Sequence, residues 1–80
     1  MKTVTVLYFA TLRQAAGVES EVIETDAADL AGLYAELRSR HGLRFETAHL
    51  RVAVDDAFAH WRDALRTGSQ VAFIPPVSGG

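Results

Sequence analysis

Apolar residues follow a two-residue period at the start of the chain, and this period predicts strands. Residues 3–9 (TVTVLYF) are dense in β-branched and aromatic side chains, which favour a strand. Residues 19–25 (ESEVIET) predict a second strand with Val22 and Ile23 as its apolar centre. A hairpin is the simplest pairing of the two strands. Residues 10–16 between them can form a helical turn.

The period changes to that of a helix in residues 26–41. Apolar side chains recur there at i, i+3, i+4 and i+7, a spacing that places them on one helix face. They are Leu30, Leu33, Tyr34 and Leu37. Thr25 or Asp26 is expected to cap the amino end, and Asp26 and Asp29 place negative charge in the first turn. Gly42 is expected to end the helix in a left-handed conformation.

The second half of the chain predicts shorter strands. Residues 50–54 (LRVAV) alternate, so one set of side chains faces the core and the other faces outward. Asp55 and Asp56 predict a turn, after which residues 57–59 begin a short return strand. Residues 70–74 predict the final strand, because a proline pair follows it.

This order of elements indicates the α+β class and the plan of a β-grasp domain, as in ubiquitin. We expect a mixed sheet of four to five strands, with the first and last strands in the middle and one main helix packed on one face. The domain would comprise residues 1–74, and residues 75–80 would form a flexible C-terminal tail that ends in Gly-Gly.

The sheet face away from the helix is predicted to be apolar and uncovered. The side chains that alternation places there are Leu7, Phe9, Ala53, Ala72 and Ile74, with Phe58 at the rim. An exposed apolar patch of this kind usually marks a docking surface. The alternative is that the irregular segments fold over this face.

Composition narrows the classes of function. Eighty residues with a net charge of −2 make one small globular domain. A nucleic-acid binder would need a basic face, and no stretch reaches the length of a membrane span. The N-terminus does not have the pattern of a signal peptide. We therefore expect a cytoplasmic protein with neither nucleic acid nor membrane as a partner.

The sequence contains little that could perform catalysis unaided. It has no cysteine, hence no thiolate nucleophile and no disulfide. His41, His49 and His60 lack the spacing of metal ligands on one helix, so no metal site is predicted. No glycine-rich loop joins a strand to a helix, so we expect no phosphate-bearing cofactor on this chain.

The final residues, PPVSGG, offer a different kind of chemistry. Two terminal glycines pack against nothing, and they form a slim strip that ends in a free carboxylate. Six extended residues reach on the order of 20 Å, enough to enter a pocket on another protein. A carboxylate reacts only after its oxygen becomes a good leaving group, for example in an acyl-adenylate made with ATP. The alternative is an ordinary frayed terminus.

The ending VAFIPPVSGG closely resembles that of the small subunits of molybdopterin synthase, in the sulfur-carrier group of ubiquitin-like proteins. The opening VTVLYFATLRQAAG is similar to the V-x-V-x-F-F-A-x-L-R-E start of that family, and the turn at residues 65–68 also matches. The resemblance therefore spans the chain. Gln14 and Ser69 replace the usual Glu and Asp of the family, and both are expected on the surface.

The resemblance implies a sulfur-carrier role. An E1-like adenylating enzyme with Mg-ATP would activate the Gly80 carboxylate, and a sulfurtransferase or cysteine desulfurase would supply the sulfur of a thiocarboxylate. The tail would then enter the large subunit of molybdopterin synthase and give its sulfur to cyclic pyranopterin monophosphate. The chain alone would be no enzyme, but the sulfur-carrier subunit of that heteromeric sulfurtransferase.

The same resemblance implies which residues serve the carrier. A narrow channel in the partner would admit Gly79, Ser78 and Val77, while Pro76 and Pro75 would stiffen the root of the tail. The residues implied for partner docking are Phe9, Phe58, Ile74 and Leu7, with Arg13 at the edge. The alternatives are a carrier for thiazole or cysteine biosynthesis, a ubiquitin-like protein modifier, and a plain interaction module.

Overall fold

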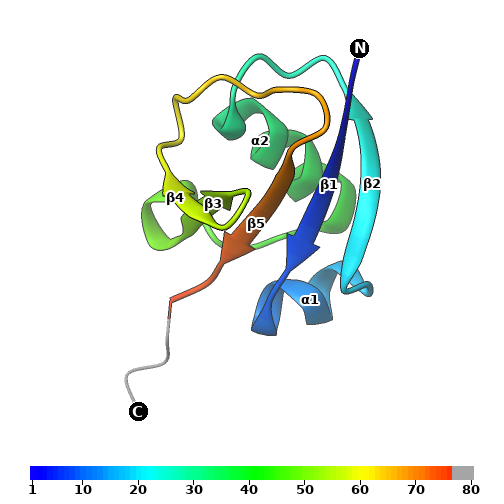
Figure 1. Ribbon diagram of the computed structural model, residues 1–80. Helices are drawn as coiled ribbons and strands as arrows, with labels where there is room; N and C mark the ends of the chain where they lie inside the picture. Colours follow the sequence, from blue (N-terminus) through cyan, green and yellow to red (C-terminus); the bar gives the residue numbers. More distant parts are fainter. Residues whose placement is uncertain (77–80) are drawn as a thin grey trace.

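The computed structural model describes residues 1–76, so the predictions for Val77, Ser78, Gly79 and Gly80 lie outside the described residues. Its centre is a mixed five-stranded sheet in the order β2-β1-β5-β3-β4 (Figure 1). The bounds of the strands are β1 Lys2–Tyr8, β2 Ser20–Thr25, β3 Arg51–Val54, β4 Ala57–Ala59 and β5 Gln70–Ile74. The first and last strands are parallel neighbours in the middle of the sheet. The expected β-grasp plan is confirmed.

Helix α2 (Leu30–His41) covers one face of the sheet, and the shorter α1 (Ala10–Ala16) follows β1 (Figure 1). A 3-10 turn, η1 (Thr47–His49), precedes β3. The four apolar side chains of α2 are all buried, as the helical spacing predicts. Gly42 ends the helix with φ +65°, a conformation that costs glycine little.

The start of α2 differs from the prediction. The helix begins at Leu30, and Asp29 caps it by accepting a hydrogen bond from the Gly32 N–H at 2.8 Å. The N–H groups of Leu30 and Ala31 donate to backbone carbonyls of the segment that follows β4, at Asp63 and Trp61. That segment thus supplies acceptors for two of the first N–H groups of the helix. The helix and its cap therefore start later than local sequence indicates.

Thr25, another of the expected caps, does not cap the helix but forms hydrogen bonds that link β2 to α2. Its side chain is buried, accepts a hydrogen bond from the Ala27 N–H and donates to the Glu36 carboxylate at 2.7 Å. The hydroxyl thus ties the end of β2 to the middle of α2. A buried hydroxyl needs such partners, because leaving it unpaired costs more than the bond gains.

The irregular segment between β4 and β5 packs on the helix side of the sheet. The Trp61 indole stacks on Phe73 with ring centroids 5.8 Å apart, and Tyr34 of α2 lies 5.1 Å from the same ring. Leu65 is buried in the same core. Within residues 1–76 the opposite face keeps its uncovered lining, so the alternative in which this segment closes that face is wrong.

Three smaller predictions are corrected. Val22 is not at an apolar centre but 69% exposed, because it alternates with the buried Ile23 on an edge strand. Ser69 is buried and not on the surface, since its backbone joins the β1–β5 pairing through the Thr5 N–H. Leu50 is buried as expected, but it precedes the strand, which begins at Arg51.

Candidate functional site

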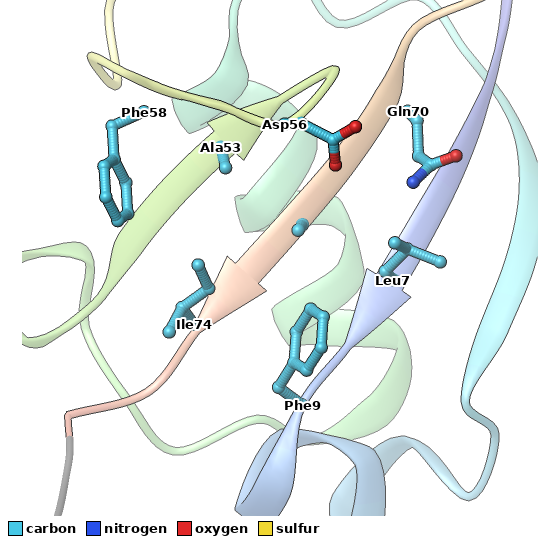
Figure 2. A pocket seen from close by; sticks show the side chains of 8 residues that line it. Leu7, Phe9, Ala53, Asp56, Phe58, Gln70 and Ile74 are labelled. Atoms are coloured by element: carbon cyan, nitrogen blue, oxygen red, sulfur yellow. The ribbon is translucent and has the colours of Figure 1, made fainter.

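The open face of the sheet carries a shallow groove of about 240 Å³. Figure 2 shows its lining side chains on the strands and on the chain next to their ends, with no helix in front of them. The lining residues are Leu7, Phe9, Ala53, Asp56, Phe58, Gln70, Ala72 and Ile74. The predicted apolar set is thus brought together in one place.

Strand register explains why this face is hollow. Ala53 and Ala72 lie directly opposite each other in the β3–β5 pair. Leu7 pairs with Ala72 on one side, and Phe58 pairs with Ala53 on the other. Side chains of paired residues share a face, so this row has two small side chains in the middle and two large ones at the ends. The alanines form the floor and the larger side chains form the walls.

Phe9 reaches the groove through a turn of the backbone. Strand β1 ends at Tyr8, and Ala10 adopts φ +49°, a left-handed conformation that costs an L-residue about 1–2 kcal/mol. The next turn of chain is α1, whose Leu12 is buried. Phe9 remains 46% exposed at the margin of the groove. The prediction that Phe9 belongs to β1 is therefore wrong by one residue, although its place on this face is confirmed.

One end of the groove is polar, which the sequence prediction missed. Asp55 and Asp56 have φ of +50° and +71°, so both central residues of the β3–β4 turn are left-handed, as tight hairpins require. Asp55 Oδ1 accepts a hydrogen bond from the Gln70 N–H at 3.0 Å, whereas the Asp56 carboxylate lines the groove. Alternation with Ala72 could have placed Gln70 on this face. The turn geometry that brings in Asp56 could not be read from alternation.

The other end of the groove is where the chain leaves the sheet. Ile74 lines the groove and is the last residue of β5; it lies near Phe9 in Figure 2. Pro75 is buried and Pro76 is exposed. A second, larger hollow flanks the two prolines and includes Phe45 and Arg51 in its lining. The predicted docking surface and the root of the C-terminal segment thus share one end of the domain.

The profile described as the ThiS family matches residues 6–80. This chain belongs to the ThiS family.

Individual relatives agree with that assignment. The chain is 32% identical to the molybdopterin synthase sulfur carrier subunit of Haemophilus influenzae, over 94% of this chain and 96% of the relative. It is 34% identical to the protein of that name from Mycobacterium tuberculosis, over the full length of both. The resemblance to molybdopterin synthase small subunits is therefore confirmed.

A solved complex shows a similar chain with a partner. In the complex of subunits 1 and 2 of molybdopterin-converting factor from Helicobacter pylori, one chain matches with a TM-score of 0.67 and 28% identity. The match covers 98% of this chain and 99% of that one.

Arg13, which the family resemblance puts at the edge of the docking surface, lies on α1 outside the lining of the groove. Its guanidinium is 4.0 Å from the Glu19 carboxylate, and both side chains are largely exposed. A second arginine lies closer to the groove. Arg51 holds its guanidinium carbon 5.3 Å from the centre of the Phe58 ring, a cation–π contact.

A cluster of ionisable groups with shifted pKa values lies elsewhere in this ThiS-family fold. The Glu21 carboxylate accepts a hydrogen bond from the Tyr8 hydroxyl at 2.5 Å and lies 2.6 Å from His41 Nε2. Burial would raise the pKa of Glu21, but the hydrogen bonds from Tyr8 and His41 outweigh it and lower that pKa. Burial and the Glu21 carboxylate raise the pKa of the Tyr8 hydroxyl.

This cluster joins β1, β2 and the end of α2, and none of its three residues lines the groove. We assign it a structural role. Across residues 1–76, no three His, Asp or Glu side chains gather as metal ligands do, and no helix is long and apolar enough to span a membrane.

Proposed function

We propose that this chain is the sulfur-carrier subunit of a molybdopterin synthase. The observation that carries the proposal is that Ile74 both lines the apolar groove and ends the strand that leads to the C-terminal segment. A partner that binds the groove therefore lies beside the root of the segment ending in Gly80. The family match and the relatives that carry this name support it.

The chemistry takes place on the Gly80 carboxylate in active sites of other proteins. One carboxylate oxygen attacks the α-phosphate of ATP, held with Mg²⁺ by an E1-like enzyme, and pyrophosphate leaves. The outer sulfur of a persulfide on a sulfurtransferase or cysteine desulfurase then attacks the acyl-adenylate and displaces AMP, which gives an acyl disulfide. A reducing thiol cleaves the S–S bond of this intermediate, and the products are the thiocarboxylate and a disulfide. This chain needs no cofactor of its own for these steps.

The sulfur is used in the large subunit of molybdopterin synthase. The thiocarboxylate transfers its sulfur to cyclic pyranopterin monophosphate, and water restores the carboxylate. Gly79 and Gly80 carry no side chain, so a narrow channel can admit them. Proline at positions 75 and 76 limits the conformational entropy lost on insertion. The groove residues Leu7, Phe9, Phe58 and Ile74 dock the activating enzyme and the large subunit in turn.

Intact-mass measurement tests the first half of the proposal. The chain is incubated with the activating enzyme, Mg-ATP and a sulfur donor, and we expect a mass increase equal to the exchange of one oxygen for one sulfur. Adducts on lysines of other proteins would instead indicate a protein modifier, and an unchanged mass would indicate a plain interaction module. Formation of molybdopterin after addition of the large subunit and cyclic pyranopterin monophosphate excludes a thiazole or cysteine pathway.

Changing the end of the chain tests the role of Gly80. Deleting Gly80, or adding one residue after it, should abolish sulfur transfer, because the reacting carbonyl would no longer reach its place in either partner. The melting temperature should stay within about 1 °C of the parent chain, since no core residue is altered. Full activity of the extended chain would contradict the mechanism.

A further inference from the structure

Two opposite charges lie near opposite ends of β3 on the open face, one beside the groove and one in its lining. Arg51 is the first residue of β3, and its guanidinium lies over the Phe58 ring, which forms one wall of the groove. Asp56 comes two residues after β3 ends, and its carboxylate lines the far end. Strand β3 spans about 10 Å from Arg51 to Val54, at 3.3 Å per step. The open face therefore has a cation beside the Phe58 wall of the groove, and an anion in the groove lining beyond the other end of β3.

Both charges lack an ion-pair partner within residues 1–76. The ion pairs of this part of the chain involve Asp26, Glu19 and Glu21, and neither Arg51 nor Asp56 takes part in one. Asp56 also occupies a left-handed position, φ +71°, where glycine would cost less. Both residues are exposed. Covering this face with an apolar surface alone would bury two unpaired charges, which is strongly unfavourable.

A second copy of the same groove meets this requirement. When a two-fold axis lies in the interface and runs across the strands, it reverses the strand direction but keeps β3 over β3. Arg51 of one copy then lies over Asp56 of the other, and Asp56 of the first lies over Arg51 of the second. Such reciprocal contacts are the rule at a two-fold interface. Arginine and carboxylate also suit each other because the guanidinium can donate two parallel hydrogen bonds.

We propose that two copies of this chain associate groove to groove, through Phe9 at the margin and Phe58 in the wall and through two reciprocal Arg51–Asp56 ion pairs. Phe58, 68% exposed, supplies the largest apolar area to be removed from water. The contact is confined to one small face, so the dimer is weak and forms at high concentration of the chain.

Self-association would also regulate the carrier. The dimer covers the groove that the proposed function assigns to partner docking, so a large subunit would compete with the second copy. The dimer itself does not depend on the proposed function, since it needs only the groove and its two charges. Failure of the dimer would leave the mass shift at Gly80 unchanged, and failure of sulfur loading would leave the dimer unchanged.

Sedimentation equilibrium of the full chain, up to about 1 mM, tests the proposal through charge reversal. We expect Arg51→Glu and Asp56→Lys each to weaken self-association at least about 10-fold, because like charges then face each other twice. The double substitution Arg51→Glu/Asp56→Lys should recover affinity to within about 3-fold of the parent chain, because opposite charges face each other again. An equimolar mixture of the two single variants should form a heterodimer for the same reason.

Controls separate charge from folding. Arg62→Glu reverses an exposed arginine outside the groove lining and should leave the dimer unchanged. Asp56→Asn tolerates the left-handed turn and removes only the charge, so it should weaken the dimer less than Asp56→Lys. Circular dichroism of each variant verifies that the fold is retained.

Several results would overturn the proposal. One is that the parent chain stays monomeric at about 1 mM. Another is that neither single substitution weakens the dimer. A third is that self-association, once lost in the single variants, returns neither in the double variant nor in the mixture of the two single variants. The proposal would also be overturned if the parent chain were monomeric and its charge variants lost affinity for a large subunit. That result would assign the two charges to the heteromeric interface.

Discussion

Both faces of the central sheet carry apolar side chains, but these side chains are buried on one face and exposed on the other. On β1, the side chains of Val4, Val6 and Tyr8 are at most 1% exposed, whereas Phe9 just beyond the strand is 46% exposed. On β5, Val71 and Phe73 are fully buried, while Ala72 between them is only partly buried. Hydrophobicity alone therefore does not decide burial here. What decides it is that α2 and the segment after β4 cover one face only.

The comparison separates stability from binding. The covered face removes aliphatic and aromatic area from water within this chain, which is the main favourable contribution to folding. The open face leaves such area in water. This area contributes favourable free energy only when another protein binds and covers it. Substitutions on one face should act on unfolding, and those on the other on association.

The largest effect is expected on the covered face. Leu33→Ala removes a fully buried side chain of α2 and should lower the free energy of unfolding by about 2–5 kcal/mol, measured by urea denaturation. Leu7→Ala is the matched change on the open face. It should lower the free energy of unfolding by less than half as much, because Leu7 is only partly buried. Equal losses would mean that the two faces do not differ in the way described.

The converse test places a charge on the open face. Phe9→Glu should weaken binding of the large subunit by about 30-fold, as for a residue contributing about 2 kcal/mol, and change stability much less. Val22→Glu is the control, since Val22 is exposed on β2 but does not line the groove. Titration calorimetry measures the affinities. A loss of folding that matches the loss of binding would place Phe9 in the core.

A smaller effect concerns pH and the covered side of the molecule. Folding lowers the pKa of Glu21, so its contribution to stability is present above the unfolded pKa of about 4.3 and is lost as pH falls through the lower folded value. The melting temperature should fall in that acid range. Glu21→Gln removes the titrating group, so the melting temperature of the variant should fall less steeply with decreasing pH than that of the parent chain.

The smallest effect is expected at the turn that presents Phe9. Ala10→Gly removes the cost of the left-handed conformation at φ +49°, but it also gives the unfolded chain more conformational entropy. The net effect should be a rise of about 0.5–1 kcal/mol in the free energy of unfolding. Chemical denaturation measures it, with Ala15→Gly in the same helix as a control that should destabilise. A loss of stability in Ala10→Gly would show that this position is unstrained.

Sequence patterns alone determined most of this protein. Alternation in residues 3–9 and 70–74, and the helical spacing from Leu30 to Leu37, predicted the β-grasp plan and the apolar members of the groove. These predictions succeed because alternation and helical period act over a few residues and leave a direct trace in the order of side chains.

Tertiary structure decided what depends on distant partners. The start of α2 is set by carbonyls at Trp61 and Asp63, some thirty residues away along the chain. The placement of Asp56 at one end of the groove and of Arg51 over Phe58 follows from a hairpin turn and a cross-strand contact. Local periodicity carries no record of such contacts, because they arise only when separate segments pack together.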